Sequence, residues 1–102
     1  MKSKYNKLVR DKIPKIIRQK GGKAIIHIAN RKQYWEKLKE KLREEVEEFN
    51  IRPSMEELAD ILEVVEAIIE FKRFSKAKLK KVKKDKKREK GGFKKRIILE
   101  ES

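Results

Sequence analysis

Four acidic residues form two pairs with the same spacing, Glu45 with Glu48 and Glu57 with Asp60. Each pair falls in a segment of helical periodicity, and residues three apart lie on one face of a helix. Antiparallel packing across the break at residues 52–53 would bring Glu45 level with Asp60, and the other two acids level with each other. Four carboxylates this close repel one another strongly unless cations balance their charge. Oxygen ligands without His or Cys favour Mg²⁺ or Mn²⁺, so we predict a metal site formed by these four residues.

The angular position of each acid on its helix, at about 100° per residue, shows how close that acid lies to the apolar stripe. On the first helix Glu45 borders the stripe and Glu48 lies one step further round, whereas Glu44 lies on the far side. On the second helix Glu57 falls inside the apolar sector and Asp60 lies on its edge. Burying an unpaired carboxylate is costly, so these positions call for a compensating charge. The alternative interpretation is that both acidic faces are solvated, as Glu-rich helix faces usually are.

Two long helices are predicted to carry the acids. Asn30 and Ser54 each begin a capping-box pattern, which predicts helices over about 31–49 and 55–74. Apolar residues recur at helical spacing in both segments. The short break between them predicts an antiparallel hairpin.

Shorter elements are predicted on either side of the hairpin. Pro14 fits the first turn of a short helix that ends at the glycine pair after residue 20. A Lys-rich helix is expected over 76–89, with few apolar residues to hold it to a core. Residues 24–28 and the tail at 93–99 are β-prone and could pair as short extended segments.

We therefore expect an all-α fold, in which a helical hairpin and a third helix are flanked by short extended terminal segments. Two amphipathic helices alone expose too much apolar surface, so a homodimer with a four-helix core is predicted, with higher homo-oligomers as the alternative. The 102 residues are expected to form one domain. Its parts are a basic segment (1–30), an acidic hairpin (31–74), a basic helix (75–90) and a tail (91–102).

Charge is distributed unevenly along this chain, whose net charge is +14. Residues 1–35 carry a net +10, residues 36–70 a net −7 and residues 71–90 a net +10. An acidic segment between two basic ones suits a polyphosphate with bound cations, because carboxylates hold the cations and bases hold the phosphates. The residues predicted to contact substrate phosphates are Lys7, Arg10 and Lys12 near the start and Lys83, Lys86 and Lys90 on the third helix.

Several classes of protein are disfavoured by composition. Without Cys and with one His, a disulfide scaffold, a zinc-thiolate site and a Ser/His triad are all disfavoured. No apolar run is long enough to span a membrane and no signal peptide is recognisable, so a cytoplasmic location is expected. Abundant Lys and Glu with few amides is typical of heat-adapted proteins. Trp35 and Tyr34 could stack on a base, but Trp35 lies in the apolar stripe, which favours core packing.

Three ordered motifs resemble one enzyme family. These motifs are the E-x-x-E and E-x-x-D pairs, the block Y-N-K-L-V-R-D-K-I-P at 5–14, and K-G-G-F at 90–93. They resemble the motifs of MazG-like all-α nucleoside triphosphate pyrophosphohydrolases. Within that family the chain resembles a short phosphoribosyl-ATP pyrophosphohydrolase-like subgroup. The resemblance implies Mg²⁺-dependent hydrolysis of a nucleoside triphosphate to the monophosphate and pyrophosphate. It implies that Glu45, Glu48, Glu57 and Asp60 hold Mg²⁺, and that Glu44 or Glu45 orients the attacking water.

Two alternatives to that enzyme stay open. The turn between Glu48 and Glu57 is about one helical turn shorter than the family usually shows, and Lys90 stands where the subgroup usually has Arg. A non-catalytic nucleotide binder is therefore one alternative. The Lys-rich third helix makes a basic nucleic-acid-binding module the other, although aromatic stacking platforms are scarce there and the acidic middle third would repel phosphates.

Overall fold

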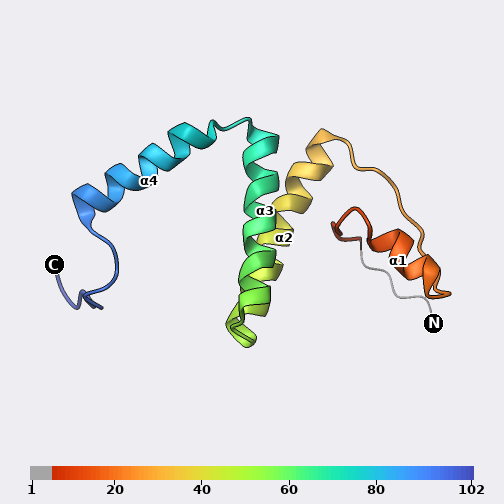
Figure 1. Ribbon diagram of the computed structural model, residues 1–102, viewed down its shortest axis with the longest axis horizontal. Coiled ribbons are helices and arrows are strands. Elements are labelled where there is room, and N and C mark those ends of the chain that lie inside the picture. Colours follow the sequence, from red (N-terminus) through yellow and green to blue (C-terminus); the bar gives the residue numbers. More distant parts are fainter. Residues whose placement is uncertain (1–5) are drawn as a thin grey trace.

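The computed structural model describes residues 6–102, and the regular secondary structure in this part of the chain is all helical, without strands (Figure 1). Residue 5, the first of the N-terminal motif, lies outside it. The all-α prediction is confirmed. The four helices are α1 (Ile13–Gln19), α2 (Arg31–Ile51), α3 (Met55–Lys72) and α4 (Lys76–Lys90).

The ends of α2 and α3 follow the capping patterns in the sequence. The Asn30 side chain accepts a hydrogen bond from the Gln33 N–H, and the Ser54 hydroxyl oxygen accepts one from the Glu57 N–H. Both bonds satisfy amides that have no partner within the helix. α2 continues two residues beyond the expected end, whereas α3 stops two residues early.

The early end of α3 results from a left-handed residue. Arg73 has φ 55°, and the N–H groups of Arg73 and Phe74 donate to carbonyls of the last helical turn. This closure satisfies carbonyls that would otherwise lack partners and turns the chain out of the helix axis. It therefore sets the direction in which α4 leaves the hairpin.

α2 and α3 pack as the expected antiparallel hairpin, and their contact forms the core. Only two apolar side chains are buried among residues 6–102, Leu38 (1% exposed) and Val64 (8%). Near the open end of the hairpin, Trp35 stacks on Phe71 with the ring centroids 5.3 Å apart, and the Tyr34 ring meets Phe71 edge-on at 5.5 Å. Trp35 thus packs between the helices, as its place in the apolar stripe predicts. This core is small for a chain of this length.

α1 and α4 lie on opposite sides of the hairpin (Figure 1). Neither helix has a buried residue. An ion pair between Lys76 and Glu66 joins the start of α4 to α3. The pairing expected between residues 24–28 and the tail is not present, because α4 carries the tail away from the side where residues 24–28 lie.

Within residues 6–102, none of the helices combines the length and the apolar character that a bilayer crossing requires.

Replacing Ser54 with Ala should lower the free energy of unfolding by about 1 kcal/mol, because the Glu57 N–H loses its acceptor. Thermal unfolding followed by circular dichroism should show a Tm lower by about 4–8 °C. Ser75→Ala is the matched control, since Ser75 caps α4 in the same way. Because α4 has no buried residue, that control should reduce helical signal and leave the Tm of the hairpin unchanged. Equal losses of Tm in the two variants would contradict the expectation that only the Ser54 cap stabilises the hairpin.

Candidate metal centre

Three carboxylates from the two long helices converge near the closed end of the hairpin. Oxygen atoms of Glu45 on α2 and of Glu57 and Asp60 on α3 all lie within 4.8 Å of one another. We call these three residues the acidic triad. The antiparallel register brings Glu45 beside Asp60, as the sequence spacing predicts. The all-oxygen donor set suits a hard divalent cation such as Mg²⁺, Mn²⁺ or Ca²⁺.

The triad is partly buried and lacks enough partners for its oxygens. Glu45 is only 6% exposed. One of its oxygens lies 3.2 Å from the Lys41 Nζ, whereas its Oε2 and the Glu57 Oε2 are buried with no hydrogen-bond partner in the described part of the chain. Buried polar atoms without partners are rare in folded proteins and point to an ion or water as the missing partner. The residues present therefore fit a bound cation.

Burial raises the pKa of Glu45, and the negative charges of Glu48 and Asp60 act in the same direction. The hydrogen bond and positive charge of Lys41 oppose this rise. The balance shows that Lys41 alone does not compensate the charge concentrated around Glu45. A divalent cation would supply the remaining positive charge.

The other two predicted acids occupy different surroundings. Glu48 is exposed and does not belong to the triad, although it lies close enough for its charge to act on Glu45. Glu44 accepts from the Lys7 Nζ at 3.1 Å and lies 3.5 Å from the Lys41 Nζ. Partial burial acts to raise the pKa of Glu44, but these two lysines outweigh it and lower the pKa. Glu44 is therefore an ionised group held by lysines beside the triad.

The N-terminal segment brings two of the predicted phosphate-binding cations to the site. The Arg10 Nη2 donates to the Asp60 Oδ1 at 2.7 Å, across fifty positions of sequence. With Lys7 on Glu44, two basic side chains from this segment contact acids in or beside the triad. Lys12 is exposed at the N-cap position of α1.

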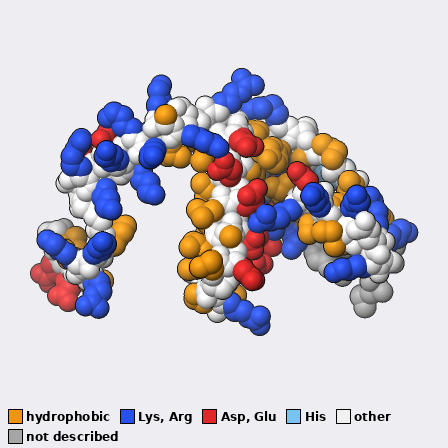
Figure 2. Space-filling model, in the orientation of Figure 1, with side chains coloured by type: hydrophobic (Ala, Val, Ile, Leu, Met, Phe, Trp, Pro, Cys, Tyr) orange, Lys and Arg blue, Asp and Glu red, His pale blue; other side chains and the backbone are white. Residues whose placement is uncertain are grey.

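The remaining three predicted phosphate-binding residues, Lys83, Lys86 and Lys90, lie on α4. Figure 2 shows a column of acidic side chains on the side of the hairpin that faces α1, and hydrophobic side chains on the side that faces α4. Within one chain, α4 and the N-terminal segment therefore flank the hairpin from opposite sides (Figure 1). The structure does not bring the two predicted groups of basic residues together.

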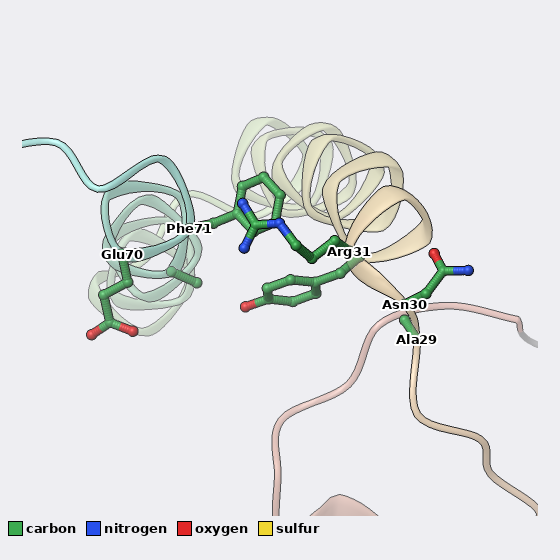
Figure 3. A pocket seen from close by; sticks show the side chains of 7 residues that line it. Ala29, Asn30, Arg31, Glu70 and Phe71 are labelled. Atoms are coloured by element: carbon green, nitrogen blue, oxygen red, sulfur yellow. The ribbon is translucent and has the colours of Figure 1, made fainter.

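Sequence reasoning missed two features. Lys41, which contacts Glu44 and Glu45, could have been found from its i, i+3 and i, i+4 spacing to these acids. A cavity of about 310 Å³ at the open end of the hairpin is lined by Ala29, Asn30, Arg31, Tyr34, Ala67, Glu70 and Phe71 (Figure 3). Tyr34 lies about 16 Å along α2 from Glu45, so this cavity is separate from the triad.

Replacing Glu45 with Gln should stabilise the protein in the presence of a chelator. The raised pKa of Glu45 means that folding disfavours its ionised form, so ionisation weakens the fold at neutral pH. A neutral Gln keeps an acceptor for Lys41 and removes that cost, with an expected gain of about 1 kcal/mol. The check is a thermal melt in EDTA, repeated with Mg²⁺.

The exposed neighbour Glu47 supplies the control, as Glu47→Gln. In EDTA the Tm should rise for Glu45→Gln alone. On adding Mg²⁺ the Tm should rise for the wild type and for Glu47→Gln, but not for Glu45→Gln. A lower Tm for Glu45→Gln in EDTA would show that the carboxylate is already compensated by Lys41.

Comparisons of the chain with protein-family models, with curated proteins and with solved structures gave no match.

Proposed function

We propose that this protein is a Mg²⁺-dependent nucleotide pyrophosphohydrolase, which cleaves a nucleoside triphosphate or related nucleotide to the monophosphate and pyrophosphate. The proposal rests chiefly on one observation. Glu45 is a nearly fully buried carboxylate with an unpartnered oxygen, and it lies in a three-carboxylate cluster that two helices build together. The motif resemblance supplies the reaction class.

In this proposal Glu45, Glu57 and Asp60 hold the cation, and Glu48 lies exposed beside them on the next turn of α2. A bound Mg²⁺ or Mn²⁺ would neutralise phosphate oxygens and acidify an attacking water. Of the two predicted catalytic carboxylates, Glu45 belongs to the triad itself. Glu44, which Lys7 and Lys41 hold in place, is better suited to fixing those lysines beside the site.

The basic residues of the N-terminal segment would contact the phosphates. Arg10 already lies against a triad carboxylate, and a guanidinium binds phosphate oxygens through two parallel hydrogen bonds. Lys7 adds a second positive charge at the same edge. Together they would orient the triphosphate against the cation.

A second candidate function is favoured by α4. Ten of its fifteen residues are Lys or Arg and it projects away from the hairpin. Such a helix could bind the phosphate backbone of a nucleic acid, with an affinity that falls steeply with salt and shows little sequence preference. Binding of nucleic acid by α4 would by itself give the acidic triad no function.

The test is to follow products from a panel of nucleoside triphosphates in Mg²⁺ and in EDTA. We expect monophosphate and pyrophosphate in equal amounts, formed in Mg²⁺ alone. Turnover that persists in EDTA, or products that are diphosphate and phosphate, would overturn the proposal. Cation-dependent nucleotide binding without any turnover would establish the non-catalytic binder instead.

A further inference from the structure

Two positively charged side chains contact the acidic triad, and they are attached to the molecule in different ways. The Lys41 Nζ lies 3.2 Å from a Glu45 oxygen on the same helix, and the Lys41 side chain is 16% exposed. The Arg10 Nη2 donates to the Asp60 Oδ1 at 2.7 Å from a separate segment, and the Arg10 side chain is 55% exposed. Lys41 is therefore a counter-charge built into α2, whereas Arg10 can change partners.

The N-terminal segment that carries Arg10, residues 6–12, is held loosely to the hairpin. It forms neither helix nor strand, and most of its residues are exposed. Two ion pairs join it to the hairpin, Lys7 with Glu44 and Arg10 with Asp60. An exposed ion pair contributes little to stability, so the Arg10 contact can be given up without disturbing the fold.

Arg10 and a cation in the triad would meet at the same carboxylate. Asp60 is one of the three acids whose oxygens gather within 4.8 Å, and Arg10 is already bonded to it. Two positive charges at one carboxylate repel each other, so each lowers the affinity of Asp60 for the other. Glu44, the partner of Lys7, lies outside the triad. A bound cation would therefore conflict with the Arg10 contact and not with the Lys7 contact.

The charge of the site determines when it can accept a phosphate. Five carboxylates and three basic side chains lie in or beside the triad, which gives a formal charge of −2. The carboxylates are those of Glu44, Glu45, Glu48, Glu57 and Asp60, and the bases are Lys7, Arg10 and Lys41. A site of this sign repels a polyphosphate. Phosphate binding therefore requires that a divalent cation first cancel the excess negative charge.

We propose that Arg10 exchanges partners when the acidic triad binds a cation. In the cation-free protein Arg10 is the counter-charge of Asp60. In the cation-bound protein Arg10 leaves Asp60 and offers its guanidinium to a phosphate group, while Lys7 keeps the segment beside the site through Glu44. Binding is then ordered, with the cation first and the phosphate second. The exchange depends on the metal centre alone, whereas the identity of the anion as a nucleotide phosphate rests on the proposed function.

Mn²⁺ binding in the absence of nucleotide tests the exchange. Arg10→Gln removes the competing charge, so we expect this variant to bind Mn²⁺ about tenfold more tightly than the wild type. Lys12→Gln is the matched control, because Lys12 is an exposed base two positions along the same segment. Its Mn²⁺ affinity should stay within about twofold of the wild type at physiological salt. Electron paramagnetic resonance of free Mn²⁺ measures the binding, and circular dichroism should show that both variants remain helical.

Unchanged or weaker Mn²⁺ binding by Arg10→Gln would overturn the proposal. Arg10 would then be a partner that supports Asp60 as a ligand and not a competitor of the cation. Equal gains in affinity for Arg10→Gln and Lys12→Gln would also overturn it, since the effect would come from overall charge.

Binding of inorganic triphosphate, followed by calorimetry, tests the second half of the exchange. In excess Mg²⁺, Arg10→Gln should bind triphosphate about tenfold more weakly than the wild type, because a charged hydrogen-bond donor is lost. In EDTA the two proteins should bind it equally weakly, since Arg10 of the wild type is then engaged by Asp60. Equal affinities in Mg²⁺, or the same tenfold difference in EDTA, would contradict an exchange that the cation controls.

Neither measurement uses turnover, so failure of this inference is distinguishable from failure of the proposed function. If the wild type binds Mn²⁺ and Arg10→Gln binds it no more tightly, the exchange is wrong and the metal centre stands. If the wild type does not bind Mn²⁺, the metal centre and the exchange are both wrong. If Arg10→Gln behaves as expected and no nucleotide is cleaved, the exchange stands and the enzyme proposal is wrong.

Discussion

Glu57→Gln should weaken Mn²⁺ binding by about a hundredfold, a loss of about 2.7 kcal/mol. Glu57 contributes an oxygen to the acidic triad, and its Oε2 is buried without a hydrogen-bond partner in the described chain. The amide that replaces it carries no charge and binds a hard divalent cation poorly. Pyrophosphate release in Mg²⁺ should fall at least as far, since the proposed reaction requires the cation. Electron paramagnetic resonance of free Mn²⁺ measures the binding.

The fold should tolerate this change. The N-cap bond of α3 uses the backbone N–H of Glu57, which Gln retains. Glu63→Gln is the matched control, because Glu63 is an exposed acid on the same helix and the substitution removes the same charge. Its Mn²⁺ affinity should stay within about twofold of the wild type. Equal losses in the two variants would mean that Mn²⁺ responds to overall charge, and the acidic triad would no longer be the metal site.

Mixing two inactive variants should restore about a quarter of wild-type activity if the chain forms the expected homodimer and α4 serves the site of the other subunit. One variant carries Glu57→Gln, and the other carries Glu in place of Lys83, Lys86 and Lys90. Random exchange makes half of the dimers mixed. In each mixed dimer, one site combines an intact triad from one chain with an intact α4 from the other. Pyrophosphate release from the exchanged mixture measures the recovery.

The control mixture pairs Glu57→Gln with Asp60→Asn. Both changes disable the triad, so every site in every dimer stays defective and no activity should return. If α4 instead serves the triad of its own chain, the first mixture will also stay inactive, because each chain then carries a defect in its own site. Recovery in the first mixture alone therefore assigns the lysines to the partner's site.

Local patterns in the sequence predicted the hairpin and all three residues of the acidic triad. Ser54 marks the start of α3 through a bond within one helical turn, and apolar spacing places Glu57 in the buried sector. The short turn fixes which residues of the two helices lie level, so Glu45 meets Asp60. Each of these features depends on contacts within a helix or across one tight turn.

Features that depend on longer connections were not predicted in the same detail. The Arg10–Asp60 ion pair requires the loop of residues 20–30 to return the N-terminal segment to the hairpin. No periodic pattern in the sequence predicts the path of that loop. The direction of α4 depends on the left-handed conformation of Arg73, which is unusual for a residue other than glycine. Glu48 follows Glu45 at the same spacing as Asp60 follows Glu57, yet it stays exposed because it lies further from the apolar stripe of α2.

Because Glu45 is buried, occupancy of the proposed cation site should affect folding as well as the proposed catalysis. An acid that is almost fully covered, in a core where residues 6–102 bury two apolar side chains, weakens the folded state as long as Lys41 alone balances its charge. A ligand at about a hundred times its Kd adds about 2.7 kcal/mol of stability, which is a large share of the total for a small domain. Chelation would therefore loosen the hairpin and expose its backbone to proteases, so resistance to digestion should track the free Mg²⁺ concentration.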